Sequence, residues 1–335
     1  MAGWEIVRRV EEPDRYAPCA AAVVPDEDAA PWSELGRRLF PTFFPPGSLV
    51  DASFALCYQQ RPIALIEAVL DPACRLTRHG EPLRIALTPH AGALCGPAVD
   101  RVLDYLIGEA TSLPHRPDFL EVEDLDVTGL MTPIGLAVMK RGGQPALVPW
   151  PMLDLRQPDA ALWQAVRPSY RTKIYWGQRH LGLVHFNRAA PDPAVFEMAV
   201  AFLTAQGTVL STATASFFRD IIAAGQGEAT LILFESRLIG CIFILEEAGT
   251  GFYGAAAYDA EASEPGGRRP SVGHWPLWEA IRRCRSRGCR RFELYRVFFR
   301  GQERPGYRFG VAHFKLGFTD TVRQRIVWRL PLEAK

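Results

Sequence analysis

The chain has 335 residues, of which 48% are hydrophobic and 22% are charged, and its formal net charge at pH 7 is +1. This composition excludes a disordered chain, and the length suffices for two ordinary domains that each bury a core. No apolar stretch reaches the roughly 20 residues that a membrane-spanning helix needs, and the N-terminus lacks a signal-peptide pattern. We therefore expect a cytoplasmic protein.

The seven cysteines and seven histidines show no metal-binding spacing. There is no C-x-x-C pair and no H-x-x-x-H or H-E-x-x-H sequence. An odd number of scattered cysteines is typical of reduced thiols rather than of a disulfide framework. The sequence therefore predicts no bound metal.

The first half of the chain alternates between predicted strands and helices. Its proline- and acid-rich stretch before Pro31 receives no element. The periodicity of the apolar residues predicts strands at Trp4–Val10, Ser53–Gln59, Ile63–Leu70, Leu83–Thr88 and Asp118–Val122, and helices at Trp32–Leu39, Val99–Thr111 and Leu130–Lys140. Strands separated by helices indicate an α/β arrangement.

The second half repeats this order at an offset near 175 residues, which pairs Arg61 with Arg237 and Phe119 with Phe292. The repeated elements are strands at Ala229–Phe234, Cys241–Leu245, Phe252–Ala257 and Arg291–Tyr295, with a helix at Pro276–Arg287. A period this long indicates two duplicated domains, about residues 1–150 and 151–335, which should share one strand order.

A helical stretch in the middle of the chain follows a stiff connector at Leu147–Pro151. Pro168 should divide the stretch into two helices, because proline interrupts the hydrogen bonding of a helix interior. Arg171 and Lys173 flank the apolar face of the second helix, on which Tyr170 lies. They are either long side chains that cover apolar surface or ligands for an anionic substrate.

The last part of the chain carries most of the positive charge. From Arg268 onward there are 17 Lys and Arg residues against 5 Asp and Glu residues. This asymmetry indicates an anionic partner, but six arginines between Arg282 and Arg291 also suit a helix end, where cations interact favourably with the dipole. Residues 291–318 are predicted to form a strand, a basic loop and a helix, followed by a strand at Val322–Leu330.

Five short motifs follow one another along residues 153–320. They are R-x-S-Y-R-x-K-I at Arg167–Ile174 with Pro168 inside it, Y-G-A at Tyr253–Ala255, W-x-x-W-E-A-I at Trp275–Ile281, G-x-x-x-F-E-L at Gly288–Leu294, and F-K-L-G-F at Phe314–Phe318. Together they resemble the FemABX-like branch of the Gcn5-related N-acyltransferase (GNAT) superfamily, whose members are tandem GNAT domains. The resemblance implies two GNAT-like domains, each a mixed, mostly antiparallel sheet flanked by helices. The first repeat matches by pattern only, and we expect it to be structural or to form the acceptor cleft.

The resemblance also implies transfer of an acyl or aminoacyl group to an amine. In Fem-type ligases the donor is an aminoacyl-tRNA and the acceptor a peptidoglycan precursor, whereas other relatives use acyl-CoA. The family's Phe-Lys pair matches Phe314-Lys315, where the lysine would stabilise the oxyanion of the tetrahedral intermediate. The alternative is a lysine at a helix C-terminus that interacts only with the dipole.

A GNAT fold binds its donor where two parallel strands splay apart, here expected at Phe252–Ala257 and Arg291–Tyr295. The loop between them contains Arg268 and Arg269, but it lacks the Q/R-x-x-G-x-G/A pattern of acyl-CoA users. The anionic donor therefore stays open between acyl-CoA and aminoacyl-tRNA, with no certain cofactor.

Several further side chains are candidates for the site in the second repeat. Tyrosines can act as general acids or orient a substrate, but at strand ends they also pack in the ordinary way. The candidates are the catalytic residue Tyr295 and the substrate-binding residues Tyr258, His274, Trp278 and Tyr307. No Ser/His/Asp or Cys/His grouping indicates a covalent intermediate, so direct attack by the amine is the simpler mechanism.

Three functions remain open from the sequence. The first is acyl or aminoacyl transfer to an amine of a small molecule or a cell-envelope precursor. The second is acyl-CoA-dependent N-acylation of an amino sugar or another amine. The third is a non-catalytic tandem GNAT chain that binds nucleic acid or a protein partner through its basic C-terminal part.

Overall fold

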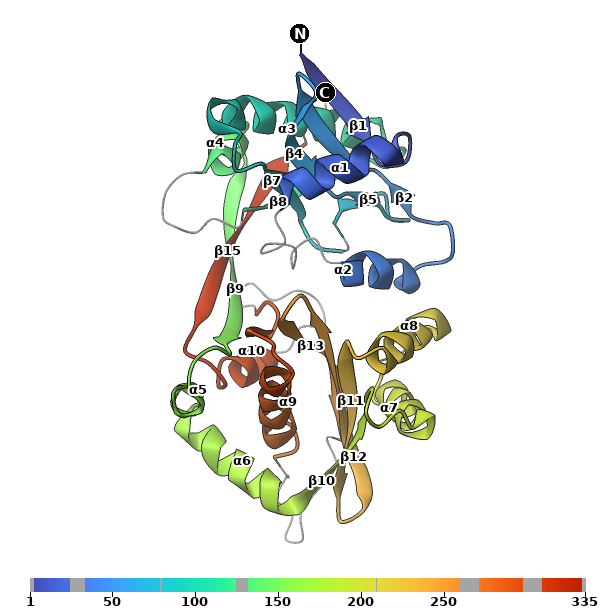
Figure 1. The fold of residues 1–335 in the computed structure, drawn as a ribbon, viewed down its shortest axis with the longest axis vertical. Helices are drawn as coiled ribbons and strands as arrows, with labels where there is room; N and C mark the ends of the chain where they lie inside the picture. The colour runs from blue at the N-terminus through green and yellow to red at the C-terminus, as the bar shows by residue number, and fades with distance from the viewer. Residues whose placement is uncertain are drawn as a thin grey trace. The chain divides into compact units, whose positions relative to one another are not determined.

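The computed structural model describes residues 3–24, 34–78, 80–124, 132–208, 210–259, 271–297 and 309–332. The chain forms two compact units, one of Met1–Val148 with Gln324–Lys335 and one of Pro149–Arg323. Each unit is a mixed sheet flanked by helices (Figure 1), which confirms the predicted α/β class. No helix among the described residues is long and apolar enough to cross a lipid bilayer.

The first unit is built on a sheet in the order β1, β3, β4, β7, β8, β15. These strands are β1 (Trp4–Arg8), β3 (Phe54–Tyr58), β4 (Arg61–Ile66), β7 (Leu83–Leu87), β8 (Phe119–Asp124) and β15 (Val322–Pro331). The pair β7 and β8 is parallel, whereas the other neighbours are antiparallel. A small second sheet contains β2 (Val50–Asp51), β5 (Val69–Leu70) and β6 (Leu76–Thr77).

Helices cover both faces of the six-stranded sheet of the first unit. Successive side chains of a strand point to opposite faces, and here both faces carry apolar side chains that the helices bury. Ile66 of β4 belongs to the core formed with α3, whereas Leu65 packs with α1. The helices and 3-10 turns of this unit are α1 (Pro13–Val23), α2 (Glu34–Leu39), η3 (Phe40–Phe43), η4 (Gly92–Leu94), α3 (Cys95–Ser112) and α4 (Pro133–Lys140).

The sequence analysis missed α1, which occupies the proline- and acid-rich stretch. Pro13 stands at the start of the helix, where the missing N–H costs nothing, and Pro18 lies within it. Tyr16 and Val23 are buried on one side of α1. Packing of that side against β3 and β4 outweighs the weak helical signal of the sequence.

The second unit has a sheet in the order β10, β11, β12, β13, β14, β9. Its strands are β9 (Gln144–Asp154), β10 (Leu181–Phe186), β11 (Gly227–Phe234), β12 (Arg237–Glu247), β13 (Thr250–Tyr258) and β14 (Arg291–Glu293). Its helices are α5 (Asp159–Ala165), α6 (Pro168–His180), α7 (Pro193–Ala205), α8 (Thr212–Ala223), α9 (His274–Ser286) and α10 (Phe309–Lys315). Again one pair, β13 with β14, is parallel and the others are antiparallel.

The two sheets therefore have the same strand order and the same pattern of directions, as the repeat predicts. The matching hairpins β3–β4 and β11–β12 also turn in the same way. Gln59 and Gln60 have positive φ in the first, and Glu235 and Ser236 have positive φ in the second. Two consecutive positive φ values are the signature of a tight hairpin whose twist suits antiparallel strands.

The sixth strand of the first unit's sheet is the last strand of the second repeat, and the sixth strand of the second unit's sheet comes from the segment that joins the two repeats. Met152–Asp154 of β9 pair with β14, and Ile326–Pro331 of β15 pair with β8. The predicted connector at Leu147–Pro151 is therefore wrong, because these residues lie within β9. Strand pairing tolerates the prolines, since the carbonyls of Pro149 and Pro151 accept hydrogen bonds from the backbone N–H groups of residues 297 and 294 at 3.0 Å.

The sheet of the second unit also has helices on both faces, with α7 and α8 on one side and α6 and α9 on the other (Figure 1). Phe243 of β12 makes an edge-to-face contact with Phe196 of α7, whereas its neighbour Ile242 packs in the core that contains α9. Pro168 starts α6 and so divides the helical stretch as predicted. Gly177 lets α6 lie close to α9, because a Cβ there would stand 2.6 Å from Cβ of Trp275.

Candidate functional site

The parallel strands of the second unit separate after three residue pairs. Pairing between β13 and β14 ends at Phe252 and Glu293, although β13 continues to Tyr258. The chain after β14 instead follows β9, because Leu294 and Val297 donate their backbone N–H groups to it. An opening between two backbone segments is thus created at the position that the sequence predicted.

Lys315, the last residue of α10, places its side chain between these diverging segments. Its Nζ lies 3.4 Å from the carbonyl oxygen of Arg296, beyond β14, and 5.9 Å from the ring centroid of Tyr253 on β13. The side chain is 7% exposed, and no acidic partner is found among the described residues. The ammonium is therefore buried with one long hydrogen bond, so N–H groups remain to bind another acceptor.

Burial also changes the protonation of this lysine. Loss of solvation, followed by repulsion from the Arg296 guanidinium, lowers the pKa of Lys315 from 10.5 to about 8. The ammonium form still predominates at neutral pH. A cation that carries little compensating charge has a strong field toward any oxyanion placed beside it.

Tyr253, whose ring lies beside this lysine, contacts a second tyrosine of β13. The hydroxyl groups of Tyr253 and Tyr258 are 3.4 Å apart. Burial raises the pKa of Tyr253 to about 12 and the pKa of Tyr258 well above its usual value. Both phenols therefore keep their protons at physiological pH and can act as hydrogen-bond donors.

Gly273, which precedes α9, brings Tyr258 and Phe314 to the same point. A Cβ at this glycine would lie 3.0 Å from Oη of Tyr258 and 3.2 Å from Cζ of Phe314. A side chain would thus press on both rings. The predicted pair Phe314-Lys315 and the predicted Tyr258 are in this way brought together in one site.

His274, the first residue of α9, packs among the aromatic rings of the site. Its ring is 4.4 Å from Tyr170 and 5.3 Å from Phe314, in edge-to-face contacts. Burial, with a smaller repulsion from Lys173, lowers the pKa of His274 to about 3. Ser271 opposes this shift weakly, yet neither ring nitrogen reaches hydrogen-bond geometry with a partner in the described parts of the chain. The imidazole is therefore buried in its neutral form.

Helix α6 contributes Tyr170 and nearby basic side chains to this group of aromatic rings. The hydroxyl of Tyr170 donates to the carbonyl of His313 at 3.1 Å, and Nζ of Lys173 is 5.3 Å from the Tyr170 ring. Arg167 lies 5.1 Å from the same ring and 2.7 Å from Nε2 of His313. Positive charge is thus concentrated at the entrance to α6, beside the aromatic rings.

Two other predicted residues pack on aromatic rings of the second unit. Tyr295 packs on Trp150 and Phe252, and its φ of +60° is unusual for a tyrosine, which excludes it from the strand predicted there. Trp278 is buried against Trp163 in the core.

Arg171 has structural partners in this fold. Its guanidinium donates to the carbonyls of Val166 and Gln164 at 2.9 and 2.6 Å, where α5 ends. The predicted residues Arg268, Arg269 and Tyr307 lie outside the described residues.

The sequence analysis missed Gly273, Arg167, His313 and the carbonyl of Arg296 as parts of the site. A backbone carbonyl and a glycine leave no chemical signature in a sequence. Arg167 did stand inside the quoted R-x-S-Y-R-x-K-I motif, and that was the available signal. His313 stands next to the Phe-Lys pair, so its contact with Arg167 depends on how α6 and α10 pack.

A known domain family matches part of the second unit. Residues 164–315 match the family described as "Acetyltransferase (GNAT) domain". No curated protein matches the sequence. The matched residues contain Tyr170, His274 and the Phe314-Lys315 pair, so the GNAT match covers the candidate site.

Several solved structures have a similar fold at low sequence identity. The crystal structure of FemX has a TM-score of 0.56 at 8% identity and covers 87% of this chain and 90% of its own. The C-terminal domain of a protein assigned as a lysylphosphatidylglycerol synthetase from Agrobacterium fabrum has a TM-score of 0.55 at 10% identity, covering 96% and 92%. A GCN5-related N-acetyltransferase from Sphaerobacter thermophilus has a TM-score of 0.50 at 16% identity, covering 99% and 96%. The chain thus has a tandem GNAT, Fem-like fold, and N-acyltransferase is the activity class that the matched domain family supports.

Proposed function

We propose that this chain transfers an acyl or aminoacyl group from an activated donor to an amine, and that Lys315 stabilises the transition state. The observation that carries the proposal is the position of Nζ, buried between the splayed segments and 3.4 Å from a single carbonyl oxygen. An ammonium held there needs no reorganisation when negative charge develops on the donor's carbonyl oxygen.

The reaction would proceed by direct attack. The neutral amine nitrogen attacks the carbonyl carbon, a C–N bond forms, and the carbonyl oxygen becomes an oxyanion that accepts a hydrogen bond from Lys315. When the intermediate collapses, the bond to the donor's thiolate or ribose oxygen breaks. Tyr258 keeps its proton and lies beside Phe314, so we assign to it the hydrogen bond that assists this leaving group. The attacking nitrogen releases its proton to solvent, and a ribose oxygen that leaves takes up a proton from solvent to become a hydroxyl group.

Two donor classes are compatible with this site, because each joins an activated carbonyl to an anionic carrier. The GNAT match supports an acyl thioester of CoA as the donor. The likeness to FemX, together with the five motifs, favours an aminoacyl ester of tRNA. The basic residues Arg167 and Lys173 beside the aromatic group suit the phosphates of either carrier.

The test is an assay in which the full-length protein receives acetyl-CoA or a mixed pool of aminoacyl-tRNA, each with a panel of amines. Thiol release that depends on the amine identifies an acyl-CoA donor. Amine-dependent deacylation of tRNA identifies an aminoacyl donor and leaves the rest of the mechanism unchanged. No turnover with either donor across amino sugars, amino acids and cell-envelope precursors would favour the non-catalytic tandem GNAT.

Lys315→Met separates chemistry from folding. Removal of one oxyanion donor lowers kcat by roughly 10²–10³-fold, and the donor's Kd should change little. The melting temperature should stay equal or rise, because burial of this ammonium is itself unfavourable. Lys140→Met is the matched control, since Lys140 also ends a helix but is exposed.

A further inference from the structure

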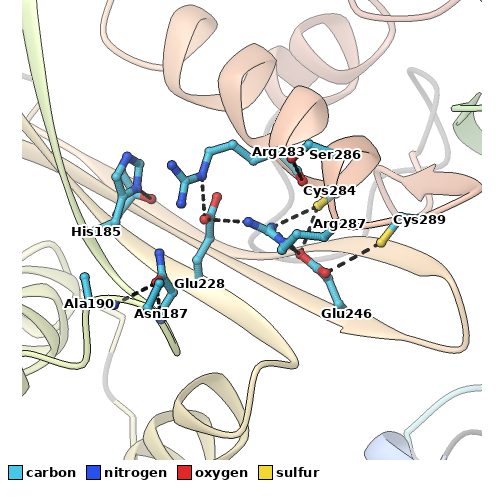
Figure 2. Close-up of polar contacts among 12 residues, drawn as sticks. His185, Asn187, Ala190, Glu228, Glu246, Arg283, Cys284, Ser286, Arg287 and Cys289 are labelled. Carbon is cyan, nitrogen blue, oxygen red and sulfur yellow. Dashed lines mark hydrogen bonds and ion pairs between the residues drawn. The ribbon is translucent and has the colours of Figure 1, made fainter.

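A second polar cluster lies at the other end of α9, in its last turn. Cys284 of α9 and Cys289, just before β14, both contact the carboxylate of Glu246 near the end of β12 (Figure 2). The Cys284 thiol donates to Oε1 at 3.3 Å, and the Cys289 thiol donates to Oε2 at 3.6 Å. The three ligand atoms all lie within 4.8 Å of one another.

The turn after α9 brings the two cysteines together although five positions separate them. The N–H of Cys289 donates to the carbonyl of Cys284 at 3.0 Å, and Gly288 has a φ of +92°. This is the usual way in which a glycine ends a helix and turns the chain back on it. Gly251 of β13 leaves room for the thiol, because a Cβ there would lie 2.8 Å from Sγ of Cys284.

Charges around the cluster are already balanced by two arginines. Arg287 donates from Nε to Oε1 of Glu246 at 2.7 Å and from Nη1 to Oε2 of Glu228 at 3.1 Å. Arg283 donates to the same oxygen of Glu228 at 2.8 Å. Two carboxylates and two guanidinium groups therefore neutralise each other. A divalent cation that replaces two thiol protons would leave this balance unchanged.

We propose that Cys284, Cys289 and Glu246 form a binding site for Zn²⁺. Two thiolates and one carboxylate oxygen are a ligand set that suits zinc and is too soft for Mg²⁺ or Ca²⁺. Binding breaks two S–H bonds, releases two protons to solvent and forms two Zn–S bonds and one Zn–O bond. Water completes the tetrahedron.

Arg287 keeps its contacts when the metal binds. Its Nη2 is 3.6 Å from Sγ of Cys284, so it can hydrogen-bond to the thiolate, while Nε stays on Oε1 of Glu246. Oε2 of Glu246 is then the oxygen that turns to the metal. Such outer contacts orient the ligands and strengthen a site. The bound ion would fasten the end of β12 to the end of α9 and the start of β14.

The chain offers an internal control in its other cysteine pair. Cys19 and Cys57 in the first unit have their sulfur atoms 3.7 Å apart. No carboxylate or imidazole completes a three-ligand group with them in the described residues. Two neighbouring thiols alone therefore do not distinguish the proposed site, whereas the third ligand Glu246 does.

The test is a titration of the reduced, metal-free full-length protein with Co²⁺, which reports thiolate ligands by an intense charge-transfer absorption band in the near ultraviolet. We expect saturation at one equivalent, loss of the band on addition of Zn²⁺, and a higher melting temperature with Zn²⁺. Cys289→Ser should abolish the band, and Glu246→Gln should lower Co²⁺ affinity at least about tenfold. The variant with Cys19→Ser and Cys57→Ser should titrate like the wild type.

Three results would overturn the proposal. The first is no band in the wild type. The second is a wild-type band in Cys289→Ser, and the third is a band that is lost only when Cys19 and Cys57 are replaced. Circular dichroism spectra show whether each variant is folded. If a variant of a buried cysteine unfolds, the Co²⁺ affinity of Glu246→Gln still tests the site.

Discussion

Each repeat places a lysine at the end of the corresponding helix, but the surroundings of the two lysines are opposite. Lys140 ends α4, which follows β8 in the first unit, and Lys315 ends α10, which follows β14 in the second. Lys140 is exposed, as a residue that only interacts with a helix dipole can be. Lys315 is 7% exposed and has its pKa lowered to about 8. A dipole interaction gives no reason to bury an ammonium, so the comparison supports a chemical role for Lys315 alone.

The regions around the parallel strand pairs of the two units also differ in how their charges are paired. Where β7 pairs with β8, Arg84 stands opposite Glu123 and donates to its carboxylate at 2.5 Å. Arg325 donates to the other carboxylate oxygen at 2.8 Å, and Arg78 lies 3.6 Å away. The first unit thus has an ion-paired network at its parallel strands, whereas Lys315 of the second unit has no acidic partner among the described residues.

The largest effect on stability should come from Glu123→Gln, because it removes the acid of the ion-paired network in the first unit. Glu123 is 4% exposed, and its loss would leave the guanidinium of Arg84, 3% exposed, without a counter-charge. Breaking a buried pair in this way costs about 3–5 kcal/mol. Denaturant unfolding measures the change, and kcat should stay within about twofold for the fraction that remains folded.

Glu121→Gln is the control for that experiment. Glu121 of β8 pairs with Arg329 of β15 at 2.9 Å, but the arginine is half exposed. Its loss should cost less than about 1 kcal/mol. Equal effects of the two substitutions would show that the buried network contributes no more than a surface pair.

Gly317→Ala should disturb the second unit to an intermediate degree. A Cβ at residue 317 would lie 2.0 Å from Cε2 of Tyr170, so α10 or α6 would have to move. Overpacking of this kind costs typically about 1–3 kcal/mol. Because the same shift moves Lys315, kcat should fall together with the melting temperature.

Gly310→Ala, also in α10, serves as the control because nothing lies within 4 Å of its added Cβ. It should be neutral or slightly stabilising, since alanine favours a helix over glycine by about 1 kcal/mol. A normal melting curve for Gly317→Ala would contradict the close packing of Tyr170 on this turn.

The smallest effect on donor binding and catalysis is expected for Arg171→Met, which tests whether the basic residues of α6 bind substrate. Two hydrogen bonds to α5 carbonyls would be lost, at a cost of about 1 kcal/mol each. Donor affinity and its dependence on salt should not change. A weaker, less salt-dependent binding of the donor would instead place Arg171 among the phosphate ligands.

Much of the fold could be predicted, because its elements carry clear local periodicity and occur twice. The strand at Ala229–Phe234 and the helix break at Pro168 depend only on neighbouring residues, and both were predicted. Helix α1 and strand β9 were missed, since prolines obscured their pattern and tertiary contacts stabilise them. The pairing of β9 with β14 and of β15 with β8 joins distant segments of the chain, and no local pattern contains such pairing.

The candidate site was predictable in part, from one motif and from polar side chains beside the predicted strands. Phe314-Lys315, Tyr258 and His274 do come together. Arg171 has the same charge as a phosphate ligand, yet only its neighbours reveal that it binds carbonyls of α5. The cluster of Cys284, Cys289 and Glu246 also escaped, because the carboxylate comes from a strand far away in sequence.

The pH dependence of kcat/KM for the donor tests the central claim most directly, because this parameter reports ionisations of the free enzyme. The pKa of Lys315 is lowered to about 8, so the ammonium is complete well below that pH and is lost as pH rises through it. We predict that kcat/KM falls above about pH 8 in the wild type, and that the small residual activity of Lys315→Met lacks this alkaline limb. Lys140→Met should retain the wild-type profile. A wild-type rate that rises through pH 8 to a plateau, or a limb that persists in Lys315→Met, would contradict a role for the Lys315 ammonium in the transition state.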